Sequence, residues 1–117
     1  MLYAGLDYHK RYSLIDVKDE NGIKKKAMRV ENEFQAVQEF FADLDEPCKV
    51  VLEAGYNWGK LYDWLDQIEK LDEVQLAHPY RVKAIAAAQV KTDSVDAGTL
   101  ADLLRANLIP RAHIPSR

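Results

Sequence analysis

Apolar and polar positions change their spacing near residue 32, and this change separates strands from helices. Before it, the pattern predicts strands over Leu2–Tyr8, Tyr12–Lys18 and residues 25–30. The dipeptide Asn21-Gly22 predicts a tight hairpin between the second and third strands, because both residues tolerate the positive φ that such a turn needs. We therefore expect the three strands to form an antiparallel meander.

After residue 32, apolar residues recur every three or four positions, as they do in amphipathic helices. The expected helices are residue 32 to Pro47, then 58–68, 79–88, and a last helix that opens at Thr92 or Ser94 and ends near Asn107. Residues 48–54 are nearly all apolar, which is typical of a central strand covered on both faces, and residues 73–77 predict a fifth strand. This order predicts an α/β chain with the ribonuclease H-like fold, a five-stranded mixed sheet flanked by helices.

Composition sets outer limits on what this chain does. Its 117 residues, 48% of them hydrophobic, suffice for one globular domain. The net charge of −3 argues against a freestanding electrostatic DNA clamp, because Lys and Arg supply most non-specific affinity for phosphate. Cys48 is the single cysteine, which excludes a disulfide or a cysteine-rich zinc site. The sequence has neither a membrane-spanning run nor a signal peptide, so we expect a cytoplasmic protein with no membrane partner.

Acidic residues stand where the predicted fold would bring strand ends together. In that topology the first and fourth strands pair in parallel, so Asp7 and Glu53 near their ends would be neighbours. A helix advances about 100° per residue, which places Asp93 and Asp96 on the face of the last helix that Leu100 buries. Capping of that helix is the alternative explanation for its two acids. Asp102 would point the opposite way into solvent, and Asp16 also reads as a solvated residue.

Four carboxylates in one pocket would repel each other, which implies a bound divalent cation. Oxygen-only ligands favour Mg²⁺ or Mn²⁺ over zinc. Such ions can activate an attacking oxygen and stabilise a leaving one in phosphodiester chemistry.

Three blocks, GLDYHK, VLEAG and KTDSVDAGTLADLL, resemble the DEDD transposases of bacterial insertion sequences, the one-ten type that includes Piv-like DNA invertases. The resemblance covers nearly the whole chain, and its most specific part is HPYRVKAIAAAQVKTDSVDA. It implies an N-terminal RuvC-like domain over residues 1–110 and an exit segment over 111–117 toward a missing C-terminal domain. The four catalytic, metal-binding acids that it assigns are Asp7, Glu53, Asp93 and Asp96.

The same resemblance implies an activity and partners. Full-length members cleave and exchange DNA strands, with a serine nucleophile from the C-terminal domain and a structured non-coding RNA as guide. It implies a homo-oligomer when full length, and an isolated fragment that is inactive. Candidates for nucleic-acid contact are His9, which shares a strand face with Asp7, Tyr56 and Asn57 in the loop after Glu53, and Lys91 before the last helix. The alternatives are a partly exposed strand-end residue for His9 and an ordinary surface lysine for Lys91.

Other functions stay open at this point. One is a nuclease resembling a Holliday-junction resolvase or ribonuclease H, and another is a non-catalytic module that binds nucleic acid or protein. An actin-like ATP-binding kinase domain also carries an aspartate on its first strand. That class places a glycine-rich turn after the aspartate, whereas Tyr8, His9 and Lys10 follow it here, so the kinase interpretation is poor.

Overall fold

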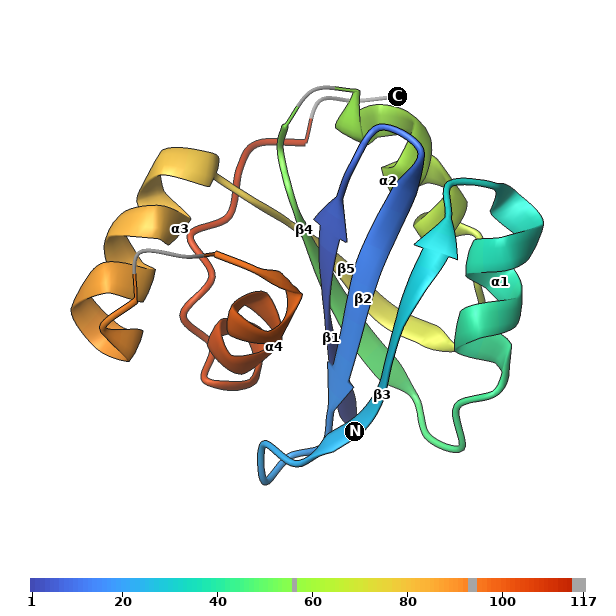
Figure 1. Cartoon of the computed structure of the whole chain (residues 1–117), viewed down its shortest axis with the longest axis horizontal. Coiled ribbons are helices and arrows are strands. Elements are labelled where there is room, and N and C mark those ends of the chain that lie inside the picture. Colours follow the sequence, from blue (N-terminus) through green and yellow to red (C-terminus); the bar gives the residue numbers. More distant parts are fainter. Residues whose placement is uncertain (56, 93–94, 115–117) are drawn as a thin grey trace.

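A five-stranded mixed sheet forms the middle layer of the molecule (Figure 1). The computed structural model describes residues 1–55, 57–92 and 95–114. The sheet order is β3-β2-β1-β4-β5, and β1 pairs antiparallel with β2 and parallel with β4. The predicted ribonuclease H-like arrangement, with the first strand central, is thus confirmed. The strands are β1 (Leu2–Tyr8), β2 (Tyr12–Lys18), β3 (Lys24–Glu31), β4 (Cys48–Glu53) and β5 (Leu71–Ala77).

Helices cover both faces of this sheet (Figure 1). The helices α1 (Phe34–Ala42) and α2 (Trp58–Asp66) pack on one face, where Phe41, Leu61 and Leu65 join the larger core cluster. On the other face lie α4 (Ala97–Arg105) and, further out, α3 (Pro79–Ile85), which continues as the π-helical segment η1 (Ala86–Val90). A second apolar cluster lies between these helices and the sheet. Within the described residues, no helix has the length and apolar character that crossing a membrane requires.

The hairpin between β2 and β3 differs from the turn that the sequence predicts. Within the described residues of this hairpin, Gly22 alone has a positive φ, +82°, and Asn21 does not. The side chain of Asp19 explains the difference, because its Oδ1 accepts the backbone N–H groups of Asn21 and Ile23, each at 2.9 Å. A side-chain acceptor that organises the turn removes the need for two left-handed residues.

The start of α4 is the largest difference from the sequence-based boundaries. We expected this helix to open at Thr92 or Ser94, but it begins at Ala97 with Asp96 as its N-cap. The preceding segment is not helical at Thr92, and Lys91 adopts a left-handed φ of 57° that ends η1. The third helix also differs from its predicted bounds of residues 79–88. It is α-helical only to Ile85 and continues with π-helical hydrogen bonding to Val90.

Gly5 sets how closely α4 lies on the centre of the sheet. A Cβ added to Gly5 would lie 2.6 Å from the backbone nitrogen of Ala101 and 2.8 Å from Cβ of Leu100, and it would clash with the carbonyl oxygen of Ala97. Only a residue without a side chain allows this approach. The close contact places the first turns of α4 over the middle of β1 and beside Asp16 of β2.

Candidate active site

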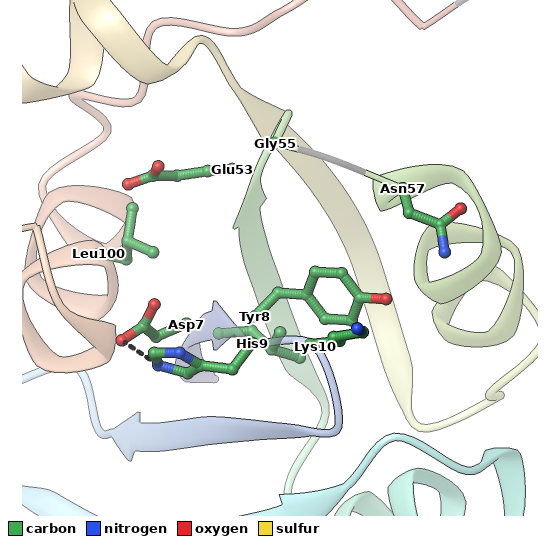
Figure 2. A pocket seen from close by; sticks show the side chains of 9 residues that line it. Asp7, Tyr8, His9, Lys10, Glu53, Gly55, Asn57 and Leu100 are labelled. Atoms are coloured by element: carbon green, nitrogen blue, oxygen red, sulfur yellow. Dashed lines mark hydrogen bonds and ion pairs between the residues drawn. The ribbon is translucent and has the colours of Figure 1, made fainter.

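Asp7 and Glu53 lie side by side at the ends of the two central parallel strands. The register of β1 and β4 runs through the pair Leu6 and Leu52, and the two acids are the next residue on each strand. Both side chains point toward α4, with Leu100 between them (Figure 2). They line a pocket of about 630 Å³, as the fold predicted from sequence requires.

The electrostatics of this pair favour a bound cation. Burial raises the pKa of the Glu53 carboxyl above its ordinary value, and the negative charge of Asp7 raises the pKa further. Both effects act against the charged form of Glu53, so a positive charge in the pocket would relieve them. Nε2 of His9 lies 3.3 Å from Oδ2 of Asp7, in a contact that remains open to solvent (Figure 2).

Asp96 lies at the first turn of α4 and caps it. Its Oδ1 accepts the backbone N–H of Thr99 at 2.8 Å, so the capping alternative holds for this residue. The periodicity placed Asp96 inside the helix. This prediction is wrong, because Asp96 precedes the first helical residue, Ala97. The Asp96 side chain lines a neighbouring hollow of about 390 Å³ instead of the pocket of Asp7 and Glu53. The Asp96 carbonyl accepts the N–H of Leu100 at 3.0 Å, which places Asp96 one helical turn from the wall of the acid pocket.

Two of the predicted site residues, Asp93 and Tyr56, lie outside the described residues. Across residues 1–55, 57–92 and 95–114, no group of three or more His, Cys, Asp or Glu side chains is close enough to hold a metal ion. The described part of the chain thus unites Asp7 and Glu53, with Asp96 nearby.

The remaining candidates for nucleic-acid contact occupy different places. His9 touches Asp7, as the shared strand face predicted. Asn57 has a left-handed φ of 58° at the start of α2 and lines the acid pocket, on the side away from the two acids (Figure 2). Lys91 is exposed at the end of η1 and lines neither the acid pocket nor the hollow beside Asp96.

Two acids that the sequence assigned to solvent, Asp16 on β2 and Asp102 on α4, are instead partly buried where α4 packs on the sheet. The Asp16 side chain is only 14% exposed and lies 3.6 Å from Nζ of Lys24, while Asp102 accepts a hydrogen bond from Nζ of Lys18 at 2.8 Å. In β2, Ile15 and Val17 point to one face of the sheet and Asp16 points to the other, so alternation alone suggests that Asp16 faces solvent. Gly5, the cross-strand partner of Asp16, was the overlooked signal that a helix approaches this face.

Comparison with known proteins identifies the family. A family model described as a transposase, DEDD_Tnp_IS110, matches residues 4–116, which is nearly the entire chain. No curated protein matches the chain. The match agrees with the sheet topology and with the paired acids at the ends of β1 and β4. On these grounds the chain belongs to the DEDD transposase family of the IS110 type.

Proposed function

We propose that this chain is the catalytic domain of a transposase that cleaves and exchanges DNA strands with the help of a divalent metal ion. Membership of the family makes it part of a DNA-cleaving class of enzymes. The observation that carries the metal-dependent mechanism is the pair of Asp7 and Glu53 at the ends of adjacent parallel strands, both directed into one pocket (Figure 2).

The chemistry of the donors fits Mg²⁺ or Mn²⁺. Asp7 and Glu53 offer carboxylate oxygens only, and burial together with the charge of Asp7 raises the pKa of Glu53, an effect that a bound cation would counteract. Asp96 is the third ligand in our proposal: Oδ1 is used by Thr99, which leaves Oδ2 as a donor. By the family resemblance we assign Asp93 as the fourth. When bound, the ion neutralises these carboxylates and stabilises charge on the phosphoryl oxygens of DNA.

The protein's own groups would perform the positioning. Asp7 and Glu53 are held by the central strands of the sheet, so their spacing is set by parallel pairing and needs little rearrangement. His9 contacts Oδ2 of Asp7 and would restrict the orientation of that carboxylate. Leu100 forms an apolar wall between the acids and would limit the directions from which a ligand reaches them (Figure 2).

The rest of the proposal comes from the resemblance to DEDD transposases. A serine on a C-terminal domain would attack the phosphodiester, and a structured non-coding RNA would guide the choice of target and donor DNA. The full-length protein would assemble as a homo-oligomer in the cytoplasm. The chain of residues 1–117 would then hold the metal-binding half of the machine and be inactive alone, with residues 111–117 leading toward the second domain.

Recombination by a longer protein that carries this chain tests the role of the acids. Asp7→Asn and Glu53→Gln should each abolish strand cleavage while the domain stays folded, because both substitutions keep side-chain shape and remove ligand charge. Asp66→Asn, at the exposed C-terminal end of α2, is the matched control and should recombine normally. Normal recombination by the Asp7→Asn protein would refute the metal-site proposal.

Thermal melts give an independent measurement on the 117-residue chain. Mg²⁺ or Mn²⁺ at millimolar concentration should raise its melting temperature, because a ligand that binds the folded state stabilises it. The rise should disappear in the Glu53→Gln chain and persist in the Asp66→Asn chain. An equal rise in all three chains would show that the ions bind elsewhere.

A further inference from the structure

Asp7, Leu14 and Arg29 form one row across three neighbouring strands. Asp7 pairs with Leu14 on β2, and Leu14 pairs with Arg29 on β3. Directly opposed residues of antiparallel strands point to the same face of a sheet, so Arg29 lies on the face that carries the acid pair. Adjacent strands are about 4.8 Å apart, which makes the row about 10 Å long from Asp7 to Arg29.

A stack of side chains connects the two ends of this row. His9, which contacts Asp7, stacks on Tyr12 with ring centroids 4.8 Å apart and an angle of 19° between the rings. The guanidinium carbon of Arg29 lies 3.9 Å from the centroid of the same Tyr12 ring. Stacking on a ring holds a guanidinium in place while its N–H donors remain available at the edge.

Asn32 fixes the backbone that supports this stack. Its side-chain Nδ2 donates to the carbonyl oxygen of His9 at 2.6 Å, and its backbone N–H donates to the carbonyl oxygen of Arg11 at 3.0 Å. The buried hydroxyl of Ser13 donates to Oδ1 of Asn32 at 2.7 Å. The connection between β1 and β2 is therefore held from two sides, and Tyr12 is positioned before any ligand arrives.

The guanidinium of Arg29 is accessible to an anion. Its side chain is 61% exposed, and its ion-pair partner Glu31, with an oxygen 3.8 Å from Nε, is about as exposed. An exposed pair at that separation contributes little and leaves the two terminal amino groups for another acceptor. Arg29 also lines the hollow beside Asp96, and it is the one cation among the described residues that do so.

We propose that Arg29 binds a backbone phosphate of the DNA strand whose scissile phosphate lies at Asp7 and Glu53. This inference rests on the proposed function. Phosphates of one B-form strand rise about 3.4 Å per nucleotide along the helix axis and also wind around it, so a row of about 10 Å places the contact fewer than three nucleotides from the cleaved bond. A planar guanidinium matches two phosphate oxygens, and such contacts position DNA without reading its sequence.

The test is DNA binding by the 117-residue chain, measured by fluorescence anisotropy on a short labelled duplex, without divalent metal and at several salt concentrations. Arg29→Gln should weaken binding roughly fivefold and lower the slope of log affinity against log salt by about 1, as loss of one phosphate contact requires. Tyr12→Leu keeps the charge but removes the stacking ring, so affinity should fall roughly threefold with an unchanged slope.

Lys60→Gln is the matched control. Lys60 also lies over an aromatic ring, that of Trp64, with Nζ 5.1 Å from its centroid, but it belongs to α2 on the opposite face of the sheet. Its substitution removes the same charge and should leave binding unchanged. Equal losses in the Arg29→Gln and Lys60→Gln chains, or no binding by the unmodified chain at low salt, would overturn the assignment of Arg29.

This measurement is independent of strand cleavage. If the acid variants recombined normally while Arg29→Gln still weakened metal-free binding, the proposed metal mechanism would fail and the phosphate contact would stand. If the acid variants were inactive and Arg29→Gln bound DNA like the unmodified chain, only the phosphate contact would fail.

Discussion

Substitution of Gly5 by alanine tests whether α4 really lies against the central strand. The added Cβ would meet the backbone nitrogen of Ala101 at 2.6 Å and Cβ of Leu100 at 2.8 Å, in addition to its clash with the Ala97 carbonyl. Two of these three neighbours are backbone atoms, which cannot rotate away as a side-chain tip can. The helix as a whole must move from the sheet, and with it Asp96 and the Leu100 wall of the acid pocket.

The size of the effect follows from packing energetics. Overpacking by a single methylene costs about 1–3 kcal/mol where side chains can adjust, and a clash with backbone belongs at the upper end. Alanine recovers about 0.4–1 kcal/mol by restricting the unfolded chain. We therefore expect Gly5→Ala to lower the free energy of unfolding by about 2–3 kcal/mol, which corresponds to a melting temperature about 10 °C lower for a domain of this size.

The assay is thermal and urea unfolding of the purified chain, followed by circular dichroism. Gly55→Ala is the matched control, because nothing lies within 4 Å of a Cβ added there. Its melting temperature should equal or slightly exceed that of the unmodified chain. If the Gly5→Ala chain melted within about 2 °C of the unmodified chain, the close packing of α4 on β1 would be wrong.

Three further predictions concern the acids. Because the folded-state pKa of Glu53 exceeds its ordinary value of 4.5, the folded chain binds more protons and loses stability as pH rises from 4.5 through the raised pKa. Glu53→Gln should flatten this fall in metal-free melts, and an unchanged pH profile would contradict it. Asp96→Ala should cost about 1 kcal/mol by loss of the cap on Thr99, whereas Asp96→Asn keeps the cap, so equal melting temperatures for the two variants would refute the capping role. Asp102 pairs with Lys18, whose side chain is only 16% exposed, so Asp102→Ala should lower the free energy of unfolding by about 1 kcal/mol. A double-mutant cycle with Lys18→Met should give a coupling energy different from zero, and a coupling energy of zero would contradict this pairing.

Much of the fold and half of the candidate site followed from the order of residues alone. Alternation and apolar runs are local properties, so they predicted the strands, the parallel pairing of β1 with β4, and hence the meeting of Asp7 with Glu53. The family resemblance, which the match over residues 4–116 confirms, rests on motifs that are also local.

Tertiary structure decided the points where a second element competes for the same side chain. Periodicity placed Asp96 inside a helix, but its carboxylate accepts the Thr99 N–H as an N-cap, so the helix begins after it. Strand alternation and helical periodicity set Asp16 and Asp102 on the side away from their apolar neighbours, which predicted solvent exposure, and both are partly buried because Gly5 lets α4 approach. The stack of His9, Tyr12 and Arg29 joins residues at the end of β1, at the start of β2 and on β3. Local patterns cannot reveal such contacts, because strand register and helix packing bring distant residues together.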